Sequence, residues 1–442
     1  MNVQEHKIGI LRIDRSGLAA AYKIKELGGV PFLSELKIAN MIEGSENIIK
    51  EFDCEFGEHT ERLLECDTII VSPGISLDIP ILRKAKEKNI HLISEIEFGF
   101  LIKHPESKII AITGSNGKST TVSLIHYILQ TAGYNSVLAG NIGMAFCSYP
   151  IEKPGIDFIV LELSSFQLEL IDKFKPDVAA ILNITPDHLN RYNNFDDYAL
   201  AKFNIFRNQD KSDLAILNLD DTMSLKHRNK LDPKYFSLNS KTDIYFDGKQ
   251  IKFGSELLNI DNSTIKGPHN IANIMASILA VSPFGISNKT IEKSLSTFAS
   301  LPHRLEFVAE INGVKFVNDS KATNTESVKY ALQSFDKPIR IIMGGGGKGE
   351  DYTVLNPYLK KYARKVYLTG ETRLEMKKAF NGSVELAVIE NFEETIRIAF
   401  KEASAGEYVV LSPACTSYDM FNNFEERGNR FKEIVLKLKN ES

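Results

Sequence analysis

The chain is predicted to be an α/β protein of three successive domains, each built on a largely parallel sheet. Three observations predict this fold class. Short continuous apolar runs, typical of strands buried on both faces, alternate with helical patterns along the chain. A glycine-rich turn joins one such run to a helix near residue 114. The length of 442 residues also exceeds what one hydrophobic core usually holds.

Residues 1–93 are expected to form a small Rossmann-like domain. The pattern predicts strands at Lys7–Leu11, Thr68–Ser72 and Ile90–Ile93, and helices at Ser16–Leu27 and Pro80–Lys88. Domains of this kind often bind a nucleotide at the carboxyl ends of their strands. The segment Leu11–Gly17 lacks the spaced glycines of such a site. A packing role therefore fits this segment as well as a ligand-binding role.

Residues 94–300 contain the most informative motif of the chain, the run Gly114, Ser115, Asn116, Gly117, Lys118, Ser119 and Thr120. It follows the apolar run Ile109–Ile112 and precedes a helical pattern, which is the context of a phosphate-binding loop. In such a loop Lys118 reaches the outer phosphates and the Ser119 hydroxyl holds Mg²⁺. The alternative is a plain strand–helix turn with a surface lysine.

Further buried strands of this region are predicted at Asp157–Leu163, Asp177–Ile184 and Leu214–Leu219. Glu162 ends the first of them and is expected to be a Mg²⁺ ligand, the alternative being a charge that caps the next helix. His188 follows the second strand, where it is either a site residue or a capping or packing histidine. Lys202 lies in a helical stretch and locally reads as a surface lysine. Residues 241–262 predict a β-hairpin, and residues 268–281 a helix.

Residues 301–442 are expected to form a second Rossmann-like domain. The pattern predicts strands at residues 315–318, 339–343, 365–368 and 408–412, and a last helix at 427–439. The loop Asn318–Asn324 suits an anionic amino acid or a ribose. A helix-capping cluster would explain its Ser, Thr and Asn residues but not Lys321. In the glycine run 344–349, Lys348 either holds a carboxylate or lies in a flexible turn. Cys415 has no evident base beside it.

Composition excludes several classes of protein. The net charge of −4 provides no strong attraction to nucleic acid or to an anionic membrane. The polar start of the chain does not resemble a signal peptide, and no apolar run is long enough to span a bilayer. The four cysteines are scattered, which predicts reduced thiols and argues against a zinc site. We therefore expect a cytoplasmic location.

Taken together, these runs resemble the Mur ligase family. The run Asn318–Asn324 and the segment Ser412–Cys415, within the longer matching run Leu411–Asp419, point to its D-glutamate-adding members. The other runs that carry the resemblance are residues 72–75, 113–120, 140–143, 161–168, 187–192, 269–270 and 302–304. The resemblance implies ATP-dependent addition of D-glutamate to UDP-N-acetylmuramoyl-L-alanine in peptidoglycan precursor synthesis, through an acyl phosphate and a tetrahedral intermediate. It also implies domains for the UDP-sugar substrate (1–93), for ATP (94–300) and for the amino acid (301–442), in a chain that we expect to be a monomer.

The resemblance also assigns site residues. Lys118 would contact the transferred phosphoryl group, Ser119 and Glu162 would hold one Mg²⁺, and His188 and Lys202 would serve a second. Lys202 becomes a candidate for carbamylation by CO₂. The matching nucleotide contacts are Asn273, Arg304 and Asp319. Asn141 and Gln167 would contact the UDP-sugar. The D-glutamate pocket would contain Lys321, Thr323, Lys348, Ser417 and Phe424.

The first domain departs from the family pattern. Leu11–Gly17 replaces the glycine-rich uridine-nucleotide loop, and Ser34 and Glu35 stand where other members meet the uracil and diphosphate. Glu35 is a poor partner for a diphosphate. Two other functions remain open at this point: a ligase for another amino acid or for folate, and a nucleotide-binding scaffold without catalysis.

Overall fold

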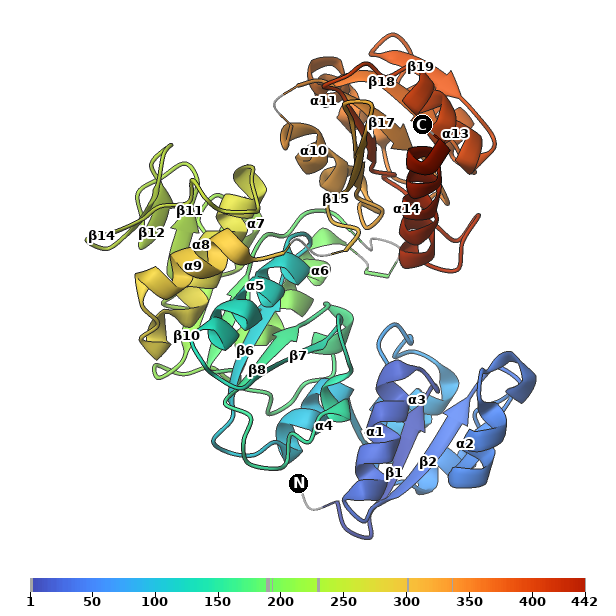
Figure 1. Cartoon of the computed structure of the whole chain (residues 1–442). Helices are drawn as coiled ribbons and strands as arrows, with labels where there is room; N and C mark the ends of the chain where they lie inside the picture. The colour runs from blue at the N-terminus through green and yellow to red at the C-terminus, as the bar shows by residue number, and fades with distance from the viewer. Residues whose placement is uncertain are drawn as a thin grey trace. The chain divides into compact units, whose positions relative to one another are not determined.

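The computed structural model describes residues 3–187, 191–192, 194–228, 231–299, 302–335 and 337–441. It contains three sheets with helices around them (Figure 1). The sheets have five, nine and six strands, and most neighbouring strands are parallel. This confirms the predicted α/β class with three domains on largely parallel sheets.

The first sheet has the order β3-β2-β1-β4-β5, and every pair in it is parallel. Its central strand β1 is followed at once by helix α1, whose N-cap Asp14 accepts from the Gly17 N–H. The predicted strands and helices of this region are confirmed to within two residues. The bounds are β1 Lys7–Leu11, α1 Arg15–Glu26, β2 Val30–Glu35, α2 Ser45–Glu51, β3 Asp53–Phe56, β4 Thr68–Val71, α3 Pro80–Glu87 and β5 His91–Ile93.

The second sheet has the order β14-β13-β12-β11-β10-β9-β6-β8-β7. The predicted hairpin at 241–262 is a run of three short antiparallel strands that extends this sheet beyond β11. The bounds are α4 Glu95–Ile102, β6 Lys108–Thr113, α5 Lys118–Thr131, β7 Ser136–Gly140, β8 Phe158–Glu162, β9 Val178–Ile181, α6 Phe195–Phe203, β10 Leu214–Asn218, α7 Thr222–His227, β11 Lys234–Ser237, β12 Ile244–Phe246, β13 Ile251–Phe253, β14 Glu256–Leu258, α8 Pro268–Val281 and α9 Asn288–Thr297.

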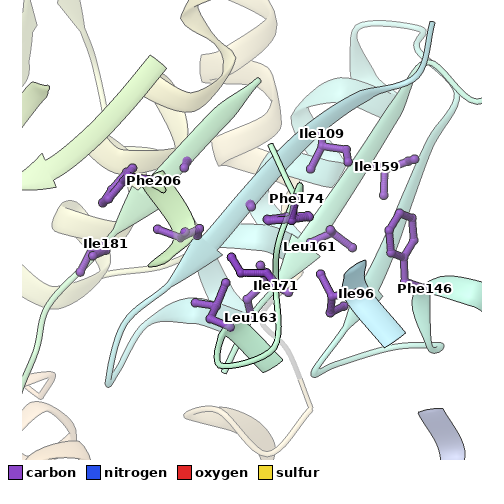
Figure 2. Close-up of a cluster of buried hydrophobic side chains, with 14 of the residues drawn as sticks. Ile96, Ile109, Phe146, Ile159, Leu161, Leu163, Ile171, Phe174, Ile181 and Phe206 are labelled. Carbon is purple, nitrogen blue, oxygen red and sulfur yellow. The ribbon is translucent and has the colours of Figure 1, made fainter. Parts of the chain in front are cut away.

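Strand β6 lies between β8 and β9 and is buried from Ile109 to Thr113. Because successive side chains of a strand alternate, Ile109 and Ala111 share one face and Ile110 and Ile112 the other. The first face joins a large apolar cluster with residues of β8, β9 and the chain after them (Figure 2). Burial on both faces explains why the sequence of this strand is a continuous apolar run. The cluster holds in place the strand that leads into the phosphate loop.

The third sheet has the order β15-β16-β20-β17-β18-β19. Only the β15–β16 pair is antiparallel, and it turns at Asn312 and Gly313, both with positive φ (50° and 78°), as a tight hairpin requires. The bounds are β15 Glu306–Ile311, β16 Val314–Asn318, α10 Thr325–Gln333, β17 Ile339–Met343, α11 Asn356–Tyr362, β18 Ala363–Leu368, α12 Arg373–Ala379, β19 Glu385–Val388, α13 Phe392–Lys401, β20 Tyr408–Leu411 and α14 Phe424–Glu441.

By internal contacts the chain divides into two units. The first consists of residues 1–262 and 272–296, and the second of residues 263–271 and 297–442. The first two sheets therefore share one unit, and the third sheet lies in the other. The predicted domain boundaries after residues 93 and 300 stay predictions. Across the described ranges, no helix is long and apolar enough to cross a membrane.

Candidate active site

The phosphate loop connects β6 to α5, as the sequence predicts. Gly114 and Gly117 have φ of 153° and 84°, in the region that favours glycine. A Cβ on Gly117 would also overlap Asn273 Oδ1 of helix α8, so the loop and Asn273 are in close contact. Helix α5 begins at Lys118, directly after this turn. Its first N–H groups are therefore available at the loop, the arrangement that binds phosphate.

The segment after β9 braces this loop. Asn183 exchanges side-chain hydrogen bonds with the backbone of Asn116, at 2.9 and 3.0 Å. The Ser115 hydroxyl donates to the Thr185 carbonyl and accepts from the Thr185 N–H, both at 2.9 Å. It also lies 3.0 Å from the Tyr198 hydroxyl. Ser115 and Asn116 are therefore held by residues about 70 positions away in the chain, which the sequence analysis did not assign to the site.

Lys118 and Lys202 meet at one backbone carbonyl. Lys118 Nζ donates to the carbonyls of Gly114 and Ser115, both at 2.8 Å, and Lys202 Nζ donates to Gly114 at 2.9 Å. Lys202 is 2% exposed, so the local interpretation of it as a surface lysine is wrong. Burial, together with the nearby Lys118 charge, holds the pKa of Lys202 well below its ordinary value. A buried lysine amine at a phosphate loop is thus biased toward its neutral form.

Glu162 ends β8, where the register pairs it with Ile112 of β6. It is 1% exposed, and Oε1 accepts from Asn141 Nδ2 at 2.7 Å. Its other oxygen, Oε2, is buried and has no hydrogen-bond partner. An unpartnered buried carboxylate oxygen is costly unless a cation balances it. Glu162 therefore fits the role of a metal ligand better than that of a helix cap.

The donor set suits Mg²⁺ bound together with phosphates. No group of three His, Cys, Asp or Glu side chains converges among the residues that the structure describes. Mg²⁺ commonly takes one or two protein ligands and completes its shell with phosphate oxygens and water. Glu162 and the buried Ser119, at the start of α5, match that pattern. His188 lies outside the described residues.

The two predicted UDP-sugar contacts differ in their surroundings. Asn141 follows β7 in an exposed turn, although its amide is tied to Glu162. Gln167 is 3% exposed, and its Oε1 accepts from the Ser164 N–H and hydroxyl at 3.0 and 3.1 Å. The structure places both beside the carboxyl end of β8, and their contacts with a substrate stay predictions.

In the second unit, Asp319 follows β16 and is buried. The Ser412 hydroxyl donates to Oδ2 at 2.8 Å, and the Leu305 N–H donates to Oδ1 at 3.3 Å. Burial raises the pKa of Asp319 to about 7, against the opposing effect of that hydroxyl and of the Arg304 charge. The predicted nucleotide contacts Asp319 and Arg304 thus interact electrostatically.

Arg427, in the first turn of α14, joins two loops of the predicted amino-acid site. It is fully buried. Its guanidinium donates to Ser320 Oγ at 3.0 Å, and to the carbonyls of Ser320, Thr416 and Cys415 at 2.8, 2.8 and 3.1 Å. The sequence analysis did not assign Arg427 to the site. Its helical spacing with Phe431, Ile434, Val435 and Leu438, all buried, was the available signal.

The residues predicted for the D-glutamate pocket are partly brought together. Lys321 Nζ lies 5.1 Å from the centre of the Phe424 ring. Ser417 is buried next to Thr416, one of the acceptors of Arg427, whereas Lys348 is exposed in its glycine turn. Thr323 donates its backbone N–H to the Lys321 carbonyl at 2.9 Å.

Cys415 is buried against the Tyr352 and Thr372 hydroxyls, and burial raises its thiol pKa, so a nucleophilic role is not indicated.

The turn after β1 is occupied by the chain's own carboxylates. Glu35 Oε2 accepts from the Ile13 N–H at 2.8 Å, and Oε1 accepts from the Lys37 N–H at 3.0 Å. Asp14 accepts from the Gly17 N–H and from the Ser72 hydroxyl, both at 2.9 Å. Backbone groups that could receive a phosphate are therefore already bound. This explains in structural terms how the first domain departs from a glycine-rich nucleotide site.

Comparison with known proteins supplies the family. Family models match the chain as the Mur ligase middle domain at residues 112–281, as the Mur ligase, glutamate ligase domain at 303–415, and as the MurD N-terminal domain at 25–80. A protein of Natranaerobius thermophilus named UDP-N-acetylmuramoylalanine--D-glutamate ligase is 39% identical, over 97% of both chains. The chain belongs to the Mur ligase family. A protein of the same name from Cytophaga hutchinsonii is 40% identical over 98% of this chain and 99% of its own.

Solved structures of Mur ligases share the fold. UDP-N-acetylmuramate-alanine ligase from Thermotoga maritima matches with a TM-score of 0.65 at 18% identity, covering 98% of this chain and 100% of its own. FolC from E. coli, solved with DHPP and ADP, matches with a TM-score of 0.59 at 15% identity, over 78% of this chain and 92% of its own. At such identities the likeness concerns the fold alone, and it agrees with the three-sheet Mur ligase architecture.

Proposed function

We propose that this Mur ligase joins D-glutamate to UDP-N-acetylmuramoyl-L-alanine with the energy of ATP, in the cytoplasmic synthesis of peptidoglycan precursors. The observation that carries the proposal is the identity of 36–40% with relatives of that name, over 96–99% of the chain. The backbone of the glycine turn before α5 and the buried, unpartnered oxygen of Glu162 support the proposal. In this proposal residues 1–93 bind the UDP-sugar, 94–300 bind ATP and 301–442 bind D-glutamate, in a monomer.

In the first unit, the phosphate loop and Asn273 would contact ATP. Arg304 and Asp319 are proposed as the nucleotide contacts of the second unit. The N–H groups at the start of α5 and the Lys118 ammonium would hold the phosphates. Ser119 and Glu162 would hold Mg²⁺, with His188 and Lys202 for a second ion. When bound, Mg²⁺ neutralises charge on the phosphates and so lowers the repulsion between ATP and the substrate carboxylate.

The proposed chemistry has two steps. A carboxylate oxygen of UDP-N-acetylmuramoyl-L-alanine attacks the γ-phosphorus, ADP leaves, and an acyl phosphate forms. The neutral amine of D-glutamate then attacks the acyl carbon to give a tetrahedral intermediate, which expels phosphate and loses a proton to form the amide. Lys118 would stabilise charge on the transferred phosphoryl group. Lys321, Thr323, Lys348, Ser417 and Phe424 would hold D-glutamate so that its amine lies close to the acyl carbon.

Lys202 is proposed to react with CO₂. A neutral amine is needed for this, and the burial that lowers the pKa of Lys202 favours that form. The nitrogen forms a bond to the carbon of CO₂ and loses a proton, which gives an anionic carbamate. The neutral amine beside Lys118 would thereby become an anion, a suitable ligand for Mg²⁺.

The alternatives differ in the amino acid or in the absence of catalysis. A folate ligase shares the fold, but the Asn318–Asn324 loop favours D-glutamate. A scaffold without catalysis would not need the buried, unpartnered oxygen of Glu162, nor Lys118 in its loop.

The decisive experiment measures phosphate release from ATP with UDP-N-acetylmuramoyl-L-alanine and one amino acid at a time: D-glutamate, L-glutamate, glycine or L-lysine. We expect release only with D-glutamate. Release with another amino acid would agree with the proposed reaction but would contradict the proposed D-glutamate pocket. Absence of release with all four would direct the assay to folate substrates.

A further inference from the structure

Arg15 extends from the first sheet to a turn of the second. It is the first residue of α1, and its guanidinium donates from Nη1 to the Gly143 carbonyl at 2.7 Å and from Nη2 to the Gly140 carbonyl at 2.9 Å. The preceding residue, Asp14, caps α1 and accepts from the Ser72 hydroxyl. The backbone next to Arg15 is therefore fixed, and its two hydrogen bonds come from the rigid planar fork of a guanidinium, which a lysine does not have.

The turn that Arg15 holds is pressed against the end of β8. Gly140 has φ of 98°, and a Cβ there would overlap the Glu162 carbonyl oxygen. The Asn141 N–H donates to that same carbonyl at 2.9 Å. Asn141 Nδ2 donates to Glu162 Oε1 at 2.7 Å. The 140–143 turn thus accepts two hydrogen bonds from Arg15 and, through Asn141, donates two to Glu162.

Asn141 determines which oxygen of Glu162 is available. With Oε1 bound to the Asn141 amide, the buried and unpartnered Oε2 is the oxygen left for a cation. Groups that hydrogen-bond to a metal ligand orient it and strengthen metal binding. Any contact that holds Asn141 in position therefore also holds the orientation of the Glu162 carboxylate.

We propose that Arg15 is a positioning residue for the metal-binding carboxylate, acting through the 140–143 turn and Asn141 on Glu162. The proposal rests on the proposed function, because it takes Glu162 as a Mg²⁺ ligand. It links the substrate domain to the metal site: a ligand that moves the start of α1 changes the orientation of Glu162. It also gives a role to the β1–α1 turn, whose amides are already bound by Glu35 and Asp14.

The test measures metal binding directly, with Mn²⁺ as the probe. Free Mn²⁺ is followed by electron paramagnetic resonance during titration of the full chain in the presence of ADP. We expect Arg15→Lys to weaken Mn²⁺ binding about three- to tenfold, less than the roughly 10- to 100-fold typical for loss of a direct partner of a metal ligand. The control is Arg207→Lys, because Arg207 is also exposed and donates to a backbone carbonyl, that of Ile171.

A double-mutant cycle tests the route. In an Asn141→Ala background, Arg15→Lys should have no further effect on Mn²⁺ binding, because the group through which Arg15 acts is gone. Unchanged Mn²⁺ affinity in Arg15→Lys, or equal losses in the presence and absence of Asn141, would overturn the inference. Failure of the proposed function is separate: it would show as the absence of D-glutamate-dependent phosphate release in the unmodified chain.

Discussion

Loss of Arg427 should reduce both the stability of the second unit and its binding of D-glutamate. In Arg427→Leu, the guanidinium that joins the loops after β16 and β20 is lost. The Thr416 carbonyl keeps the Gly346 N–H as a partner, so the cost comes mainly from the carbonyls of Ser320 and Cys415. At about 1–3 kcal/mol for each buried acceptor, the loss is roughly 2–6 kcal/mol.

Part of this loss is recovered. Burial lowers the pKa of Arg427 to about 10, so the charge is itself unfavourable where it lies, and a leucine fills some of the volume. We therefore expect a net loss of about 2–3 kcal/mol in the free energy of unfolding. The KM for D-glutamate should also rise several-fold, because the loops that carry Lys321 and Ser417 lose their common anchor.

The assay is scanning calorimetry of the full chain, together with initial rates of phosphate release at varied D-glutamate. The matched control is Arg430→Leu, in the same helix. Arg430 is exposed and pairs with Glu393 and Glu433, so its loss should cost less than about 1 kcal/mol. The reasoning would be refuted if the two variants were equally stable, or if Arg427→Leu kept the KM of the unmodified chain.

Four other perturbations have defined outcomes. Gly117→Ala should weaken ATP binding at least about tenfold by isothermal titration, since alanine is strained at a φ of 84° and its Cβ would overlap Asn273; unchanged affinity would contradict the loop geometry. Lys202→Ala should abolish ligase activity, and excess bicarbonate should not restore it; full activity would end the carbamate proposal. Lys321→Ala should raise the KM for D-glutamate, and an unchanged value would mean that the pocket is misplaced. Burial raises the pKa of Asp319 to about 7, above the value of an unfolded chain, so the folded state loses stability as pH rises from about 4 to 7. The loss is at most about 1.4 kcal/mol per pH unit. In Asp319→Asn, calorimetry at varied pH should show a weaker dependence of stability on pH, and an unaltered dependence would reject the assignment.

The parts of the fold that were predicted correctly share one property: their signal is local. Strands buried on both faces, such as β6 and β9, have continuous apolar sequences, and α8 was predicted at its observed bounds. Strands β3 and β19 were not predicted because each has only four residues, all exposed or half-buried, and an apolar pattern of that length is too short to distinguish a strand from a loop. The phosphate loop was found because all its groups are consecutive in sequence.

The site residues that were missed act across long separations. Asn183 and Tyr198 brace the loop only because β9 pairs beside β6 and α6 follows it, and nothing in their neighbouring sequence indicates this. The burial of Lys202 also arises from this packing, whereas its neighbouring sequence predicts only a surface lysine in a helical stretch. Arg427 differs, because the apolar spacing of α14 already placed it on the buried face.

The two hydrogen bonds that Lys118 donates to its own loop weaken its attraction for anions that make few contacts. The ammonium is already paired with the carbonyls of Gly114 and Ser115, so an anion must offer it a stronger interaction than two neutral acceptors provide. A chloride ion or a lone carboxylate brings one charge and few contacts. A polyphosphate brings several charges and oxygens, which the lysine and the N–H groups of the helix start engage together. If the loop binds ATP as proposed, it should discriminate by total charge, and small monovalent anions should compete poorly with a polyphosphate.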